Sequence, residues 1–157
     1  MIAVKQCLRT VIAILIPLCA CISVHSQTVH NPNEEDDIRE AIFRSQLTAG
    51  VNFLSIDGKD PSEAFMKRFE GSDPPTLKLS RARKKKVLRD VTEVVDRKTD
   101  RDGTILKVGN VHWIDQNSVT VEGGNYCGSL CNASGIFHVV REKGIWVVKN
   151  FDVQIIS

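Results

Sequence analysis

The chain has 157 residues, with 21 lysines and arginines against 19 aspartates and glutamates. Two of the basic residues, Lys5 and Arg9, lie in an N-terminal segment that we expect to be removed, which leaves 19 charges of each sign. This neutral balance is not typical of nucleic-acid-binding proteins, and we predict no nucleic-acid partner. The length fits one ordinary domain with its own core.

The first 26 residues are typical of an export signal. Lys5 and Arg9 precede an uncharged apolar run over residues 10–24. That run is too short for a confident membrane span, so we predict a signal peptide over residues 1–26 and a mature chain that begins at Gln27. The protein is then periplasmic or secreted.

A second interpretation of the leader stays open. Residues 18–21 resemble a bacterial lipobox, in which Cys21 would carry a lipid anchor. We favour simple cleavage, so that association with the membrane is expected only if Cys21 is lipidated. After the leader, we expect a flexible tail over residues 27–33 and a single domain over residues 34–157.

The first predicted element of the domain is an amphipathic helix that begins near Glu34 and ends before Gly50. Its apolar stripe consists of Ile38, Ile42, Phe43 and Leu47. A short strand over residues 51–56 follows. A second helix begins at residues 60–63, where either Asp60 or Ser62 can act as the cap. Its buried face is predicted to be Phe65, Met66 and Phe69.

Residues 80–103 permit two interpretations. The spacing of Val87, Leu88, Val91, Val94 and Val95 fits a helical stripe. The same segment is rich in β-branched residues, which favour strands. We leave the secondary structure of this segment open.

Four strands are predicted after Gly103, over residues 105–114, 118–126, 135–142 and 145–155. Their short connections indicate an antiparallel meander. The order of helices followed by a run of strands predicts an α+β fold, with the N-terminal helices packed on one face of a curved antiparallel sheet.

Residues 60–69, 108–114, 119–124 and 144–148 resemble a group of uncharacterised exported bacterial proteins. The element order is similar to that of the nuclear transport factor 2-like, cystatin-like α+β cone superfamily. This resemblance implies a cone-like roll. The superfamily includes ligand-binding domains, isomerases, dehydratases and protein adaptors, and no catalytic residue of its enzymes can be placed on this sequence, so the resemblance supplies no activity.

Cys127 and Cys131 are the two cysteines of the mature chain. On a straight strand their Cα atoms would lie ~13 Å apart, too far for a disulfide, so pairing requires a turn. Gly128 and Ser129 favour such a turn, and an even pair in an oxidising compartment predicts a disulfide. The alternatives are two free thiols or a metal or redox site, for which this spacing is not typical. We predict no metal site and no cofactor.

His112 and His138 are the candidate catalytic residues, since a histidine beside Asp115 or Glu122 inside a cone suits general acid–base chemistry. Histidines on a half-exposed sheet are more often ordinary polar surface. The candidate lining of a ligand pocket consists of the aromatic residues of the meander, Trp113, Tyr126, Phe137 and Trp146. Aromatic residues at strand spacing also form ordinary core.

A basic run over residues 78–89 contains Arg83, Lys84, Lys85 and Lys86. It suits an anionic lipid or polysaccharide surface or an acidic partner. The simpler interpretation is a solvated, mobile loop.

The pattern as a whole favours an exported, non-catalytic domain that binds a small apolar ligand or a protein partner, with homodimerisation possible. The two alternatives are an enzyme with a His/carboxylate cluster in the cone and an envelope-associated module that uses the basic run.

Overall fold

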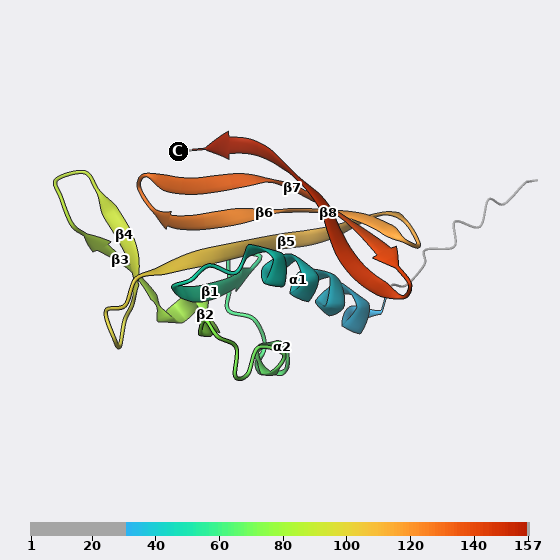
Figure 1. Ribbon diagram of the computed structural model, residues 1–157, viewed down its shortest axis with the longest axis horizontal. Helices are drawn as coiled ribbons and strands as arrows, with labels where there is room; N and C mark the ends of the chain where they lie inside the picture. The colour runs from blue at the N-terminus through green and yellow to red at the C-terminus, as the bar shows by residue number, and fades with distance from the viewer. Residues whose placement is uncertain (1–30, 157) are drawn as a thin grey trace, which may run out of the picture.

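The structure is a computed structural model, and it describes residues 31–156. The predicted signal peptide lies outside these residues. The fold is mixed α/β, with one large eight-stranded sheet and two α-helices in the described part of the chain (Figure 1). The elements are α1 (Pro32–Gln46), β1 (Val51–Ile56), α2 (Glu63–Lys67), β2 (Thr76–Lys78), the 3₁₀ turn η1 (Leu79–Arg81), β3 (Ala82–Lys86), β4 (Thr92–Asp96), β5 (Gly103–Asp115), β6 (Ser118–Gly128), β7 (Cys131–Glu142) and β8 (Ile145–Ile156).

Strands β5 to β8 form the antiparallel meander that the sequence predicts. The sheet as a whole is mixed rather than antiparallel, because β1 pairs in parallel with both β2 and β5. Strands β3 and β4 form a hairpin, residues 82–96, whose strand pairing to the rest of the sheet is the single pair between Glu93 and Gly128. Figure 1 shows this β3–β4 hairpin standing out from one end of the sheet.

Helix α1 lies against β5, β7 and β8. Asn31 caps it by accepting a hydrogen bond from the backbone of Asn33, and two glutamates lie in its first turn, near the positive end of the helix dipole. The predicted stripe is buried, with Ile38, Ile42 and Phe43 fully inaccessible to solvent.

Helix α2 is capped by Ser62, whose hydroxyl accepts a hydrogen bond from the backbone of Phe65. Asp60, the other candidate cap, instead accepts from the backbone of Ser80 at 2.7 Å. Just after α2, Arg68 binds Asp37 at 2.6 Å and Glu40 at 2.8 Å, and these bonds raise the pKa of its guanidinium. The two helices are therefore joined by an ion-pair network.

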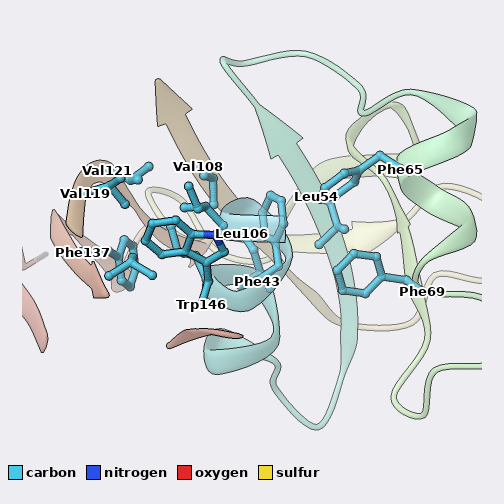
Figure 2. Packing of buried hydrophobic residues seen from close by; sticks show 13 residues of the cluster. Phe43, Leu54, Phe65, Phe69, Leu106, Val108, Val119, Val121, Phe137 and Trp146 are labelled. Carbon is cyan, nitrogen blue, oxygen red and sulfur yellow. The ribbon is translucent and has the colours of Figure 1, made fainter. Parts of the chain in front are cut away.

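Two hydrophobic clusters lie on opposite faces of β1. The main cluster packs beneath α1, and Figure 2 shows Phe43 between the pair Phe65 and Phe69 and the group around Trp146. The second cluster consists of Val51, Phe53, Val94 and Ile105. Strand β1 is thus buried on both faces, and the polar Asn52 and Ser55 are buried together with its apolar residues.

The segment that the sequence left open is a hairpin, so the strand interpretation is confirmed for residues 82–86 and 92–96. The prediction of a mobile loop over the basic run is wrong at β3, which pairs along its length with β4. Burial explains this result, because β-branched Val94 and Val95 lie in contact with the sheet while Val87 and Leu88 are exposed.

Candidate functional site

The four aromatic residues predicted to line a pocket are divided between the two clusters. Trp113, Phe137 and Trp146 belong to the main cluster, and the two tryptophan rings meet edge to face at 5.6 Å. Tyr126 belongs to the second cluster, where the ammonium groups of Lys84 and Lys107 lie 4.8 Å and 5.4 Å from its ring centre. The four rings therefore do not share one pocket.

The two candidate catalytic histidines lie on the sheet face opposite α1. His112 pairs with Thr120 and Thr120 pairs with His138, so a strand separates the two imidazoles. Val119 and Val121, which flank Thr120, point into the main cluster, and side chains alternate along a strand. The histidines therefore face away from the core.

A His–carboxylate pair is present, but on this outer face. Nε2 of His138 lies 2.8 Å from a carboxylate oxygen of Asp152, and Asn150 donates to the other oxygen. Asp115, one of the two carboxylates suggested by the sequence, instead accepts a hydrogen bond from the backbone of Asn117 in the β5–β6 turn. Hydrogen bonds from Ser118 and Asn117 lower the pKa of Asp115.

The predicted disulfide between Cys127 and Cys131 is present, with Cα atoms 5.3 Å apart. It closes the tight turn between β6 and β7. This turn is tied to the β3–β4 hairpin by backbone and hydroxyl hydrogen bonds between Ser129 and Thr92 at 2.8–3.0 Å. The disulfide therefore stabilises the point where the hairpin meets the sheet.

The four basic residues predicted as an anionic-surface site lie along β3. Arg83 and Lys85 both contact Asp100, and the hydrogen bond from Lys85 leads the interactions that lower the pKa of this carboxyl. Lys84 lies over Tyr126, and Lys86 is exposed. Two of the four basic residues of β3, Arg83 and Lys85, are therefore paired with a carboxylate, whereas Lys84 and Lys86 are not paired with one within the described residues.

A hollow of about 450 Å³ lies at the C-terminal end of α1, and we name it the helix-end hollow. It lies on the α1 face of the sheet, where α1 and three strands meet. Its lining consists of Ser45, Gln46, Asn125, Phe137, Val148, Lys149, Asn150 and Phe151.

Gln46 is the distinctive residue of the helix-end hollow. Both polar atoms of its carboxamide are buried, and neither has a hydrogen-bond partner within the described residues. Buried polar groups are nearly always paired, so an orphaned donor and acceptor at the edge of a hollow require an explanation. A ligand that offers the complementary acceptor and donor would satisfy both atoms once the side chain turns into the hollow, because neither atom is open to solvent in this structure.

The remaining groups of the hollow are aromatic rings, a carboxamide and polar groups that are bonded elsewhere. The rings of Phe137 and Phe151 stack at 4.2 Å, and Asn125 adds a second carboxamide. The hydroxyl of Ser45 donates to the carbonyl of Ile42, and the ammonium of Lys149 is paired with Glu142. The lining therefore offers neutral hydrogen bonding beside aromatic surface, without a poised acid, base or nucleophile.

Sequence reasoning missed Gln46, although a signal was present. The residue lies four positions after Ile42 and eight after Ile38, so it continues the buried stripe of α1. A polar residue in such a stripe is the pattern that would have singled it out.

A second hollow, of about 490 Å³, lies between the start of β1, β4 and the disulfide-closed turn. It is lined by Thr48, Glu93 and Asp102 among others, but by none of the buried unpaired polar side chains found in residues 31–156. It therefore lacks the feature that distinguishes the helix-end hollow.

Residues 31–156 contain no group of three or more metal-ligating side chains, and none of their helices is long and apolar enough to cross a membrane. Comparison with protein families, with curated proteins and with solved structures finds no match to this chain.

Proposed function

We propose that this protein is an exported, non-catalytic binding domain whose helix-end hollow takes a small ligand with an aromatic or apolar body and an amide-like polar edge. The observation that carries the proposal is the buried, unpaired carboxamide of Gln46 at the border of the hollow. A planar ligand could accept a hydrogen bond from the NH₂ group of Gln46 and donate one to its carbonyl oxygen, which would give both atoms a partner.

The energetics favour a binding role for this group. A buried polar atom without a partner costs about 1–3 kcal/mol, so an amide that only filled space would be replaced at a gain in stability. The same penalty is removed when a ligand binds, which makes recognition of an amide edge selective against molecules that lack it.

The proposal includes the finer architecture implied by the resemblance, a cone-like roll in which the sheet curves around α1. It also includes export by cleavage before Gln27, outside the described residues. The packing of α1 against β5, β7 and β8 supports this arrangement, because it places the hollow between the helix end and the inner face of the sheet.

The test uses benzamide and 2-pyridone as probes, in ligand-observed NMR with the purified exported protein. We expect saturation transfer to both probes, competition between them, and loss of the signal in Gln46→Met. The matched control is Gln116→Met, which changes an exposed glutamine in the turn between β5 and β6. Equal binding by Gln46→Met, or no binding of either probe by the wild type, would contradict the proposal.

Thermal unfolding separates loss of binding from loss of fold. Gln46→Met removes an unpaired amide and keeps the side-chain volume, so we expect stabilisation by about 1 kcal/mol, or an increase of about 2–6 °C in Tm. A lower Tm would mean that the amide is paired in solution.

A further inference from the structure

Four of the eight exposed large apolar side chains of the described residues lie at one end of the molecule. Leu88, 69% exposed, lies with Val87 at the tip of the β3–β4 hairpin, and Leu130, 80% exposed, lies in the β6–β7 turn. Hydrogen bonds between Thr92 and Ser129 hold the hairpin against that turn. Ile156 joins the same end, since it pairs with Ala133, two residues after the turn. Figure 1 shows the hairpin, the turn and the end of β8 on the same side.

The apolar tip is flanked by positive charge. Residues 84–91 contain Lys84, Lys85, Lys86 and Arg89 against a single acid, Asp90. Lys85 is paired with Asp100. Lys84, Lys86 and Arg89 form no ion pair with a carboxylate of the described residues. They outnumber the two acids near the tip that also lack an ion pair, Asp90 and Glu93, so the tip keeps a net positive charge.

The combination of these two features selects among anionic partners. A soluble polyanion such as an acidic polysaccharide would use the basic residues but would leave Val87, Leu88 and Leu130 in water. An anionic bilayer satisfies both, because its headgroups attract lysine and arginine while its acyl boundary buries the apolar side chains.

We propose that the tip of the β3–β4 hairpin, together with Leu130, docks this end of the protein onto an anionic lipid bilayer. Val87 and Leu88 enter the headgroup–acyl boundary, and Lys84, Lys86 and Arg89 lie at the level of the lipid phosphates. The surface is separate from the helix-end hollow and does not depend on the ligand proposed there.

The experiment measures flotation of the purified mature chain, which begins at Gln27, with two kinds of vesicle. One is phosphatidylcholine alone, and the other contains about 30% phosphatidylglycerol, which gives the bilayer a negative surface potential. We expect binding to the anionic vesicles, weaker binding at high salt, and little binding to the neutral vesicles. In Leu88→Trp, the added indole should show a blue-shifted emission only with anionic vesicles.

Two variants test the two components. Lys86→Gln/Arg89→Gln should weaken binding about thirtyfold, since each basic residue near an anionic surface contributes about fivefold to the affinity. Val87→Ser/Leu88→Ser should also lose binding, because serine side chains bury too little apolar surface to gain free energy at the headgroup–acyl boundary.

Matched controls lie away from the hairpin. Lys67→Gln/Lys143→Gln removes the same charge from α2 and the β7–β8 turn, and Ile114→Ser/Ile145→Ser removes exposed apolar side chains near the end of β5 and at the start of β8. Both should bind as the wild type does, and circular dichroism checks that every variant folds.

Three results would overturn the proposal. One is absence of binding to anionic vesicles by the wild type. Another is equal binding to neutral vesicles. The third is loss of binding in Lys86→Gln/Arg89→Gln with full retention in Val87→Ser/Leu88→Ser, which would identify the tip as a purely electrostatic site for a polyanion.

Discussion

The body of the protein and the β3–β4 hairpin are stabilised in different ways. In the body, α1 and the long strands β5 to β8 bury Ile42, Phe43 and Leu106 completely. The hairpin buries Val94 and Val95 and packs Ala82 against the second cluster, and its other contacts include the polar pairs Arg81 with Asp96 and Thr92 with Ser129.

This difference indicates which region can tolerate substitutions without a loss of stability. Burial of apolar area dominates stability, whereas exposed ion pairs contribute little. Strand β3 is an edge strand, and lysines on an edge also discourage pairing with other chains. The hairpin can therefore carry charge and exposed apolar residues for contact with a surface, while the body supplies the stability.

The largest expected effect is in the body. Phe43→Ala should lower the free energy of unfolding by about 3–5 kcal/mol, because it removes a fully buried ring that contacts Phe65 and Phe69. Urea unfolding measures the change. Leu88→Ala in the hairpin is the control and should have almost no effect. A similar loss in both variants would remove the distinction between body and hairpin.

Asp96 is the strongest polar anchor at the base of the hairpin. Its carboxylate is buried and accepts from Arg81 at 2.7 and 2.9 Å and from the hydroxyl of Thr99 at 2.7 Å. Burial raises the pKa of Asp96, but the hydrogen bonds from Thr99 and Arg81 lower it by more, so the net pKa lies below the ordinary value. Asp96→Asn should therefore cost about 1.5–3 kcal/mol at neutral pH.

The pH dependence gives this prediction its sign. A pKa lowered by folding means that the carboxylate stabilises the protein above the unfolded-state pKa of about 3.9, and that this stabilisation is lost as the pH falls through the lowered folded-state pKa. The difference in the free energy of unfolding between the wild type and Asp96→Asn should thus be largest at pH 7 and should shrink below pH 4. Asp100→Asn, at an exposed carboxylate, is the matched comparison. A difference that grows on acidification would contradict the assignment.

The disulfide lies between the two regions. Removing it in Cys127→Ser/Cys131→Ser should destabilise the protein by about 2 kcal/mol, since so short a loop restricts the unfolded chain only modestly. Intact mass under non-reducing conditions should show both thiols blocked in the wild type. Two titratable thiols in the native protein would refute the pairing.

The smallest expected effect is in the basic run. Replacing Arg83, Lys84, Lys85 and Lys86 with glutamine should shift the urea midpoint by less than the Phe43, Asp96 or disulfide variants do, because these side chains lie largely in water and their ion pairs are screened by salt. Hydrogen exchange can sharpen the comparison, with amides of residues 82–86 expected to exchange faster than those of β6. A large loss of stability would show that β3 contributes to the core.

Several features of the fold could be predicted because they depend on local patterns. The stripe of Ile38, Ile42 and Phe43 identified α1, and the alternation after Gly103 identified the four long strands. The hairpin of residues 82–96 could not be decided, because β-branched residues at a spacing that also fits a helix give conflicting local signals, and only burial of Val94 and Val95 against the sheet resolves them.

The candidate site was less predictable. The aromatic residues and histidines were predicted as site residues from their chemical type. In the structure the aromatic residues are divided between two clusters, and the histidines lie on the outer face of the sheet. Gln46 drew no attention because its type is common. Its significance is the absence of a partner among the described residues, and that property depends on neighbours from three strands that are distant in sequence.

The sequence by itself determined the elements whose signals lie within one segment: the α1 stripe, the alternating strands of the meander, and the spacing of Cys127 and Cys131 that permits a disulfide across a turn. Only the tertiary structure decided the parallel pairing of β1, the two-sided core, the orphaned amide of Gln46 and the gathering of Leu88 and Leu130 at one end. The physical reason is that pairing, burial and hydrogen-bond satisfaction are relations between residues brought together by folding, and a linear pattern specifies only which face of its own element a side chain occupies.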